Sequence, residues 1–106
     1  MRESGFSGFL WDAGNGLKCQ KHGVSISEIE YVLAHAETLI VPDPKSSRRE
    51  PRLLAIGRTQ EGRYTFVVFT PRQSAGATLL RPISARYMHK KEFNKYEQEI
   101  ARAQKR

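Results

Sequence analysis

Three segments with the composition of β-strands follow one another closely in the second half of the chain. Residues 52–58 (RLLAIGR) and 63–70 (RYTFVVFT) are rich in branched and aromatic side chains, and only four residues separate them. So short a connection predicts antiparallel pairing, and Gly62 suits the positive φ of a bulged hairpin turn. Residues 78–86 (TLLRPISAR) follow the Gly- and Ser-containing loop RQSAGA. Because Pro82 cannot donate a ladder hydrogen bond, it predicts an edge position or a β-bulge.

The clearest helical pattern lies in the first half of the chain. Residues 25–37 (SISEIEYVLAHAE) place Ile29, Val32, Leu33 and Ala36 at the i, i+3, i+4, i+7 spacing of one buried face. This spacing predicts an amphipathic helix that packs on the sheet.

Shorter elements are expected around this helix. A strand at 9–12 precedes a weak helix through GNGLKCQK that Asp12 would cap, and the β-rich run TLIV ends at the loop PDPKSS. The chain closes with a helix whose apolar stripe consists of Phe93, Tyr96, Ile100 and Ala103.

The order of these elements predicts an α+β fold. The N-terminal helices and the C-terminal helix would pack on one face of a mostly antiparallel sheet of four to five strands, as a two-layer sandwich. We expect residues 1–106 to form a single domain, with loosely ordered ends at 1–8 and 98–106. The other face of the sheet would then be open, concave and positively charged.

Net charge narrows the classes of partner. The chain has 18 Lys and Arg against 11 Asp and Glu, a formal charge of +7, which favours nucleic acid or an acidic protein as partner. It shows no secretory signal, no apolar run long enough to span a bilayer and no large apolar face for a membrane surface. With one cysteine, Cys19, it cannot form an internal disulfide, so we expect a reduced, cytoplasmic protein.

The stretch KHGVS, residues 21–25, has two interpretations. As a boundary between helices, Gly23 would adopt a left-handed conformation, and Ser25 would form a capping box with Glu28. As part of a site, Lys21 and His22 would handle phosphate. The local residues favour the boundary, without excluding the site.

Arginine dominates the three late strands. Six arginines lie in these strands or at their ends, namely Arg52, Arg58, Arg63, Arg72, Arg81 and Arg86. Their planar guanidinium groups suit phosphate, although any single one could instead be solvated or paired with Glu50 or Glu61. Alternation along the last strand predicts that Ser84 and Arg86 face a site while Ile83 and Ala85 face the core.

Other patterns carry less information. Lys90 and Lys91 predict a solvated helix face that could also guide RNA or dock a partner. Cys19 and His22 have C-x-x-H spacing without a second motif to complete a zinc site, so we expect no metal.

Several of these motifs together resemble a known family. The dipeptide WD, then KHGVS, PDP, a Glu-x-Arg leading into LLAIGR, then GRYTFVVFT and RPISAR, with a Glu and a Tyr in the closing helix, resemble the BrnT toxin family. The resemblance covers about residues 9–97. It implies a RelE-like fold and the toxin half of a bacterial type II toxin–antitoxin pair, a ribonuclease that inhibits translation.

The resemblance also implies a site and partners. His22 or Glu50 would act as the base, with Arg52, Arg72 and Arg86 as the cations of the reaction, without metal or cofactor. Further RNA contacts would come from Lys21, Arg58, Arg63, Arg81, Ser84, Lys90 and Lys91. The partner would be a BrnA-like ribbon-helix-helix antitoxin, and operator DNA would be bound only through that complex. The alternative is a non-catalytic nucleic-acid- or partner-binding module on the same fold, which the charge fits equally well.

Overall fold

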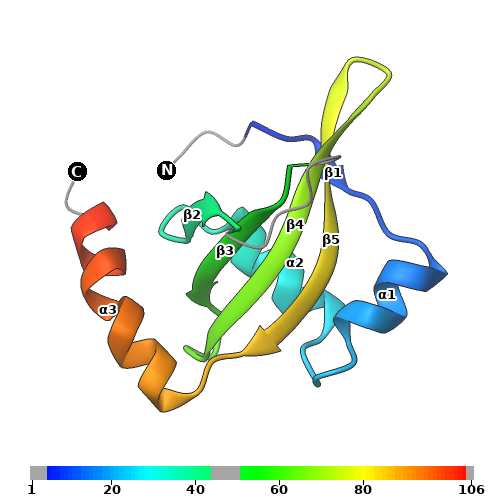
Figure 1. Ribbon diagram of the computed structural model, residues 1–106. Helices are drawn as coiled ribbons and strands as arrows, with labels where there is room; N and C mark the ends of the chain where they lie inside the picture. Colours follow the sequence, from blue (N-terminus) through cyan, green and yellow to red (C-terminus); the bar gives the residue numbers. More distant parts are fainter. Residues whose placement is uncertain (1–4, 44–50, 105–106) are drawn as a thin grey trace.

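The computed structural model describes residues 5–43 and 51–104, which are arranged around a five-stranded sheet (Figure 1). The strands are β1 (Gly8–Phe9), β2 (Leu39–Pro42), β3 (Leu53–Arg58), β4 (Tyr64–Ser74) and β5 (Ala77–Tyr87). They lie in the order β1-β5-β4-β3-β2, with β1 parallel to β5 and the other neighbours antiparallel. The described helices are α1 (Ala13–Cys19), α2 (Ile26–Ala34) and α3 (Lys90–Gln104). The predicted fold of helices on a mostly antiparallel sheet is confirmed.

The main core lies between the sheet and the two N-terminal helices. It joins Cys19, Val24, Ile29, Val32 and Leu33 to Ala55, Val67, Phe69, Leu80 and Ala85 of the strands. These side chains are almost fully buried, so the hydrophobic effect on this face supplies much of the stability of the fold.

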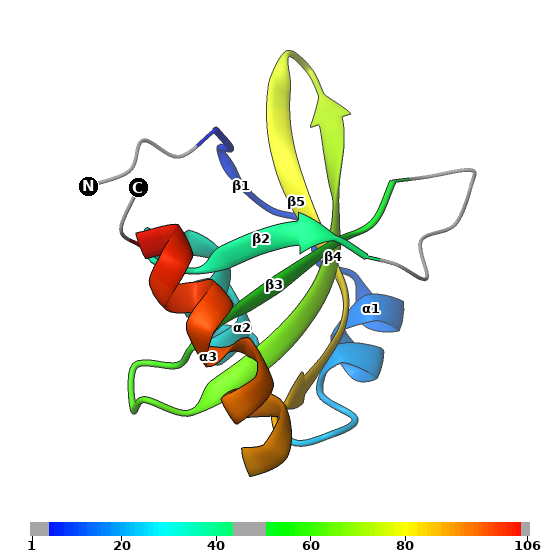
Figure 2. The same cartoon turned by 60° about the vertical axis from the view of Figure 1, so that its left-hand side comes forward.

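Helix α3 reaches the opposite face of the sheet (Figure 2). The ring of Phe93 lies edge-on to Tyr64 at 4.5 Å between centroids, and Tyr96 lies edge-on to Phe66 at 5.5 Å. Because Phe66 and the core residue Val67 are neighbours in a strand, their side chains point to opposite faces. The prediction that all helices share one face is therefore wrong for α3. Among the described residues, no helix is long and apolar enough to cross a membrane.

Helix α2 ends earlier than its apolar spacing predicts. It stops at Ala34 instead of continuing to residue 37, and Ala36 is exposed rather than buried. The hydroxyl of Thr38 donates to the Val32 carbonyl at 2.6 Å, which satisfies one carbonyl of the last turn. A Cβ atom on Gly57 would lie 2.5 Å from that hydroxyl, so this position in β3 needs a glycine.

Strands β4 and β5 are longer than expected. The segment RQSAGA, interpreted above as a loop, continues both strands to a two-residue turn, where Ala75 and Gly76 have φ values of 50° and 81°. The side chains of Gln73 and Thr78 are hydrogen-bonded across the hairpin at 3.0 Å. In Figure 1 this hairpin projects beyond the rest of the sheet.

Asn15 connects α1 to strand β5. Its side-chain amide donates to the carbonyl of Pro82 at 2.9 Å and to that of Leu10 at 3.0 Å. Its oxygen accepts from the backbone of Asp12 at 2.7 Å, which closes a capping box at the start of α1. The strand expected at 9–12 is shorter and ends at Phe9. Asp12 lies outside the strand and caps α1, which confirms the predicted cap.

Replacing Asn15 with alanine should destabilise the protein. The side chain is only 5% exposed, so the substitution removes one buried hydrogen bond, one part-buried hydrogen bond and half of a capping box. We expect a loss of about 1–3 kcal/mol in the free energy of unfolding, measured by urea denaturation. The exposed Asn94 on α3 is the matched control, and Asn94→Ala should stay within about 0.5 kcal/mol of the parent. Equal stabilities of the two variants would contradict this role.

Candidate functional site

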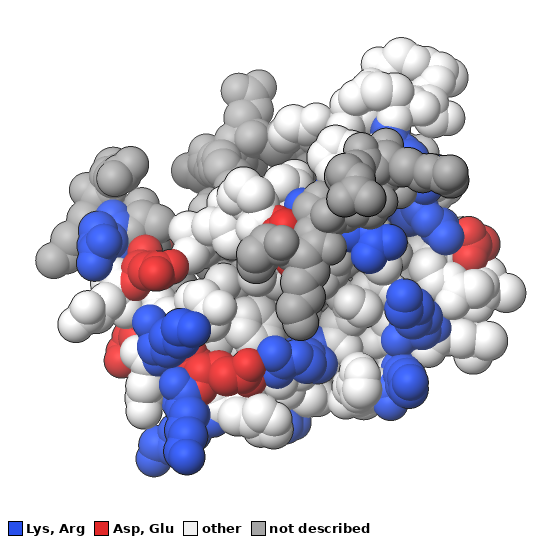
Figure 3. Space-filling view, in the orientation of Figure 1, with Lys and Arg blue, Asp and Glu red and all other residues white. Residues whose placement is uncertain are grey.

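A groove of about 410 Å³ crosses the sheet face that α3 partly covers. Its apolar and aromatic lining comes from Leu54, Phe66, Val68, Ile83, Ala85 and Tyr96. Its polar and charged lining comes from Lys18, His22, Asp43, Arg52, Ser84, Arg86 and Glu92. Figure 3 views the molecule in the orientation of Figure 1, with α2 behind the sheet, and shows several groups of Lys and Arg side chains on this side.

Four of the residues singled out from the sequence meet in this groove. They are His22 from the α1–α2 turn, Arg52 just before β3, and Ser84 and Arg86 from β5. A histidine, a hydroxyl and two guanidinium groups are thus brought together from segments as far apart as residues 22 and 86. Such a set can transfer a proton and stabilise negative charge on a phosphate.

The stretch KHGVS serves both as a boundary and as part of the groove. Gly23 has a φ of 91°, and Ser25 forms the expected capping box with Glu28. His22 is exposed and lines the groove, whereas Lys21 is exposed outside the groove lining. The first interpretation is therefore confirmed for Gly23 and Ser25, and the location of His22 is compatible with the second.

Glu28 and Tyr87 fix this turn to the sheet. The Tyr87 hydroxyl donates to the Glu28 carboxylate at 2.7 Å. Burial raises the pKa of Glu28, but hydrogen bonds from Ser25 and Tyr87 outweigh that effect and leave the pKa below its ordinary value. The same bond raises the pKa of Tyr87, which therefore keeps its proton at neutral pH. The turn that carries His22 is held by an ionised carboxylate and a neutral phenol.

A β-bulge at Ile83 shapes the wall of the groove. Val68 pairs with Ser84 and Phe69 pairs with Pro82, so Ile83 is the extra residue of β5. Pro82 predicted either an edge position or a β-bulge, and the structure has the bulge. Ser84 lines the groove as the alternation predicts, but Ile83 does so as well and is not in the core cluster. The expectation that Ile83 faces the core is wrong, because the bulge interrupts the alternation.

Arg86 is held in a defined orientation. Its Nη1 and Nη2 atoms donate to the two carboxylate oxygens of Glu92 at 2.8 and 2.7 Å. Its guanidinium carbon lies 4.5 Å from the centroid of the Phe66 ring. Glu92 also accepts from the backbone N–H of His89 at 3.0 Å, so the start of α3 is tied to the same side chain.

This ion pair changes the titration of both partners. The hydrogen bonds from Arg86, and then the one from His89, lower the pKa of Glu92 to about 2. Glu92 in turn raises the pKa of Arg86. Both groups are therefore charged at neutral pH, and the guanidinium of Arg86 faces one fixed anion within the groove.

Other predicted site residues, both catalytic and RNA-binding, lie outside the groove lining. Arg63 stacks on Tyr87 with its guanidinium carbon 3.5 Å from the ring centroid, and Arg81 forms an ion pair with Asp12 at 2.7 Å. Arg72 pairs with Leu79 in the projecting hairpin. Lys90 and Lys91 are exposed in the first turn of α3. None of these residues lines the groove together with His22 and Arg86, and Glu50 lies outside the described residues.

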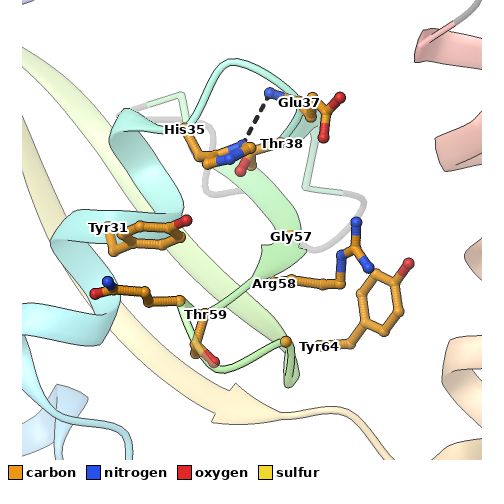
Figure 4. Close-up of a pocket in the computed structure, with 10 residues that line it drawn as sticks. Tyr31, His35, Glu37, Thr38, Gly57, Arg58, Thr59 and Tyr64 are labelled. Atoms are coloured by element: carbon orange, nitrogen blue, oxygen red, sulfur yellow. Dashed lines mark hydrogen bonds between the residues drawn. The ribbon is translucent and has the colours of Figure 1, made fainter.

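A second cavity, of about 220 Å³, lies between the end of α2 and the β3–β4 turn (Figure 4). Figure 4 shows Arg58 beside the Tyr64 ring, with 5.6 Å between the guanidinium carbon and the ring centroid. His35 there accepts from the backbone of Glu37 at 3.2 Å. Arg58 is the one predicted site residue in its lining, so this cavity does not gather the expected chemistry.

Lys18, Glu92 and Tyr96 also line the groove, but none was identified as a site residue from the sequence. Lys18 precedes His22 by four residues, but α1 ends between them at Cys19, so helical spacing could not link the pair. Glu92 lies three residues after His89, which is the spacing of a capping box, although histidine is not a usual N-cap residue. That spacing was one signal, and the Glu and Tyr of the closing helix that contribute to the family resemblance were another.

Cys19 and His22 do not act together. Cys19 is completely buried in the main core, and burial raises the pKa of its thiol to about 11. It is therefore a neutral core residue at physiological pH. Within residues 5–43 and 51–104, no group of three or more His, Cys, Asp and Glu side chains is placed to hold a metal ion.

The Arg86–Glu92 pair predicts how the attachment of α3 depends on pH. The pKa of Glu92 is about 2 in the folded protein against an ordinary value of 4.5. A lowered folded-state pKa stabilises the protein fully above about pH 4.5, and this contribution is lost as the pH falls toward 2. Carboxyl-carbon NMR should therefore give Glu92 a titration midpoint well below 4, and Arg86→Gln should move it back toward 4.5. A midpoint near 4.5 in the parent would contradict the pair.

A comparison with family models identifies the chain at the family level. The model described as "Ribonuclease toxin, BrnT, of type II toxin-antitoxin system" matches residues 11–92. No curated protein matches the chain. The matched segment includes every groove residue named above except Tyr96. The resemblance seen in the sequence is confirmed, and the chain belongs to the BrnT family of ribonuclease toxins of type II toxin–antitoxin systems.

Proposed function

We propose that this chain is an endoribonuclease that cleaves single-stranded RNA in the groove, without a metal ion, and so stops translation in the cytoplasm. Residues 1–106 would act as one toxin domain. The observation that carries the proposal is the meeting of His22, Ser84 and Arg86 over an apolar and aromatic lining. A nucleoside can pack on such a lining while its phosphate contacts the charged groups.

In this proposal the RNA supplies its own nucleophile. The 2′-oxygen attacks the adjacent phosphorus while His22 takes the proton of the 2′-hydroxyl. The P–O5′ bond then breaks, and the departing 5′-oxygen takes a proton from water. The products are a 2′,3′-cyclic phosphate and a 5′-hydroxyl, with no change of oxidation state. Glu50, the other predicted base, remains an alternative outside the described residues.

The cations stabilise the transition state in this proposal. Arg52 and Arg86 line the groove and would offset the negative charge that develops on the phosphate oxygens. The bonds from Arg86 to Glu92 and to the Tyr87 carbonyl use three of its five N–H groups. Glu92 would hold the guanidinium in place while the other two N–H groups reach a phosphate oxygen. Arg72 lies outside the groove lining, so we assign it no part in the reaction.

The partner is the second part of the proposal. Type II systems pair a toxin with a protein antitoxin, and we propose a BrnA-like ribbon-helix-helix protein encoded beside this chain. It would cover the groove and the basic start of α3, where Lys90 and Lys91 are exposed. Complementary charge would speed this association, and operator DNA would be bound only by the antitoxin half of the complex.

The proposed chemistry has a direct test. We expect the purified chain to cleave single-stranded RNA in the presence of EDTA and to leave 2′,3′-cyclic phosphate ends, detected by mass spectrometry. His22→Gln removes the proposed base and should lower the rate on the order of 10²–10⁴-fold with unchanged unfolding. Cleavage that EDTA abolishes and a divalent ion restores would contradict the mechanism. Retained oligonucleotide binding without any cleavage would favour the non-catalytic binding module.

A further inference from the structure

A hollow of about 230 Å³, smaller than the groove and separate from the cavity at the end of α2, adjoins the groove. Lys18, Arg52 and Ile83 line both spaces, so they form the boundary between them. The rest of the hollow is lined by Gly14 and Asn15 of α1 and by Arg81 and Pro82 of β5. We call this space the cationic hollow. A ligand that fills the groove and extends past Ile83 enters it.

The two spaces differ in charge. The groove lining includes three cations, Lys18, Arg52 and Arg86, together with the carboxylates of Asp43 and Glu92. The lining of the cationic hollow includes Lys18, Arg52 and Arg81, and no carboxylate is among its described residues. Among the described lining residues, the hollow therefore has a larger excess of cations than the groove, although the groove contains the histidine.

Arg81 is oriented by Asp12, the N-cap residue of α1, and α1 itself lines one side of the cationic hollow. Its Nη1 atom donates to the Asp12 carboxylate at 2.7 Å, and its side chain is 23% exposed. Asp12 caps α1 and is not part of the hollow lining. One carboxylate outside the hollow thus fixes Arg81, and the lining includes Lys18 and Arg52 as two further cations. A planar guanidinium held in this way suits a phosphate group.

We propose that the cationic hollow is a second phosphate-binding subsite, which takes the phosphate next to the one cleaved in the groove. This inference rests on the proposed function, and it deepens it by defining the substrate as a single strand with at least two consecutive phosphates. The apolar lining of the groove takes the nucleoside, and Arg81 and Lys18 take the flanking phosphate. Double-stranded RNA is excluded because its bases are not free to enter the groove.

The test uses short substrates with one ribose among deoxyribose units, so that a single bond can be cleaved. One substrate has the scissile phosphate alone, and two others add one phosphate on its 5′ or its 3′ side. We expect one of these additions to raise kcat/KM about 10–100-fold, the effect of a charge-assisted contact. Equal kcat/KM values for all three substrates would overturn the proposal.

Substitutions then identify the side chains that produce the difference in kcat/KM between the substrates. Arg81→Gln should reduce the ratio of kcat/KM between the two-phosphate and one-phosphate substrates to near one. Lys18→Gln should reduce it as well, without breaking the pair with Asp12. Arg63 stacks on Tyr87 away from both spaces, so Arg63→Gln is the matched control and should keep the parent ratio. A parent ratio in both Arg81→Gln and Lys18→Gln would refute the subsite.

Failure of the proposed function gives a different result, because no substrate would then be cleaved at all. Binding of all-deoxy oligonucleotides still tests the hollow in that case. Tighter binding of the two-phosphate form, lost in Arg81→Gln, would support the subsite. Equal binding of the one- and two-phosphate forms would overturn it.

Discussion

The hydrogen bond from Asn15 to the carbonyl of Pro82 fixes the geometry on which the groove depends. The β-bulge at Ile83 interrupts the pairing of β5 with β4, and Pro82 lies beside it. The buried amide of Asn15 uses the Pro82 carbonyl to hold α1 against β5. Lys18 and His22 follow at the end of that helix and in the turn after it. One buried side chain thus places the first part of the chain at the edge of the groove.

The other side of the groove depends on the pair of Arg86 and Glu92. Strand β5 supplies the guanidinium, and the first turn of α3 supplies the carboxylate. The Phe66 ring supports the arginine, and Tyr96 packs on the same ring. The position of α3 and the orientation of Arg86 are therefore coupled. A change at Glu92 alters both, whereas a change at the exposed Lys90 leaves this contact intact.

Local signals in the sequence were sufficient for the elements and for several of their ends. Branched and aromatic runs predicted the strands, and Ser25 with Glu28 predicted the cap of α2. Pro82 predicted an edge position or a bulge, and the structure has the bulge. The face that each arginine occupies could not be predicted, because it depends on strand register and on aromatic partners. Arg58 and Arg63 lie at facing strand ends, yet they stack on rings in different hydrophobic clusters. The presence of Lys18 in the groove likewise follows from tertiary packing, which no local pattern records.

We propose that the groove, rather than the basic surface as a whole, carries the ribonuclease activity. Arg86 and Arg58 are a matched pair, because each guanidinium lies over an aromatic ring. Arg86 lines the groove, whereas Arg58 lines the cavity between the end of α2 and the β3–β4 turn. The most direct measurement compares the cleavage rates of Arg86→Lys and Arg58→Lys, which keep the charge and lose the guanidinium fork. We expect a loss on the order of 10²-fold for Arg86→Lys and a parent rate for Arg58→Lys. Equal effects of the two substitutions would contradict it.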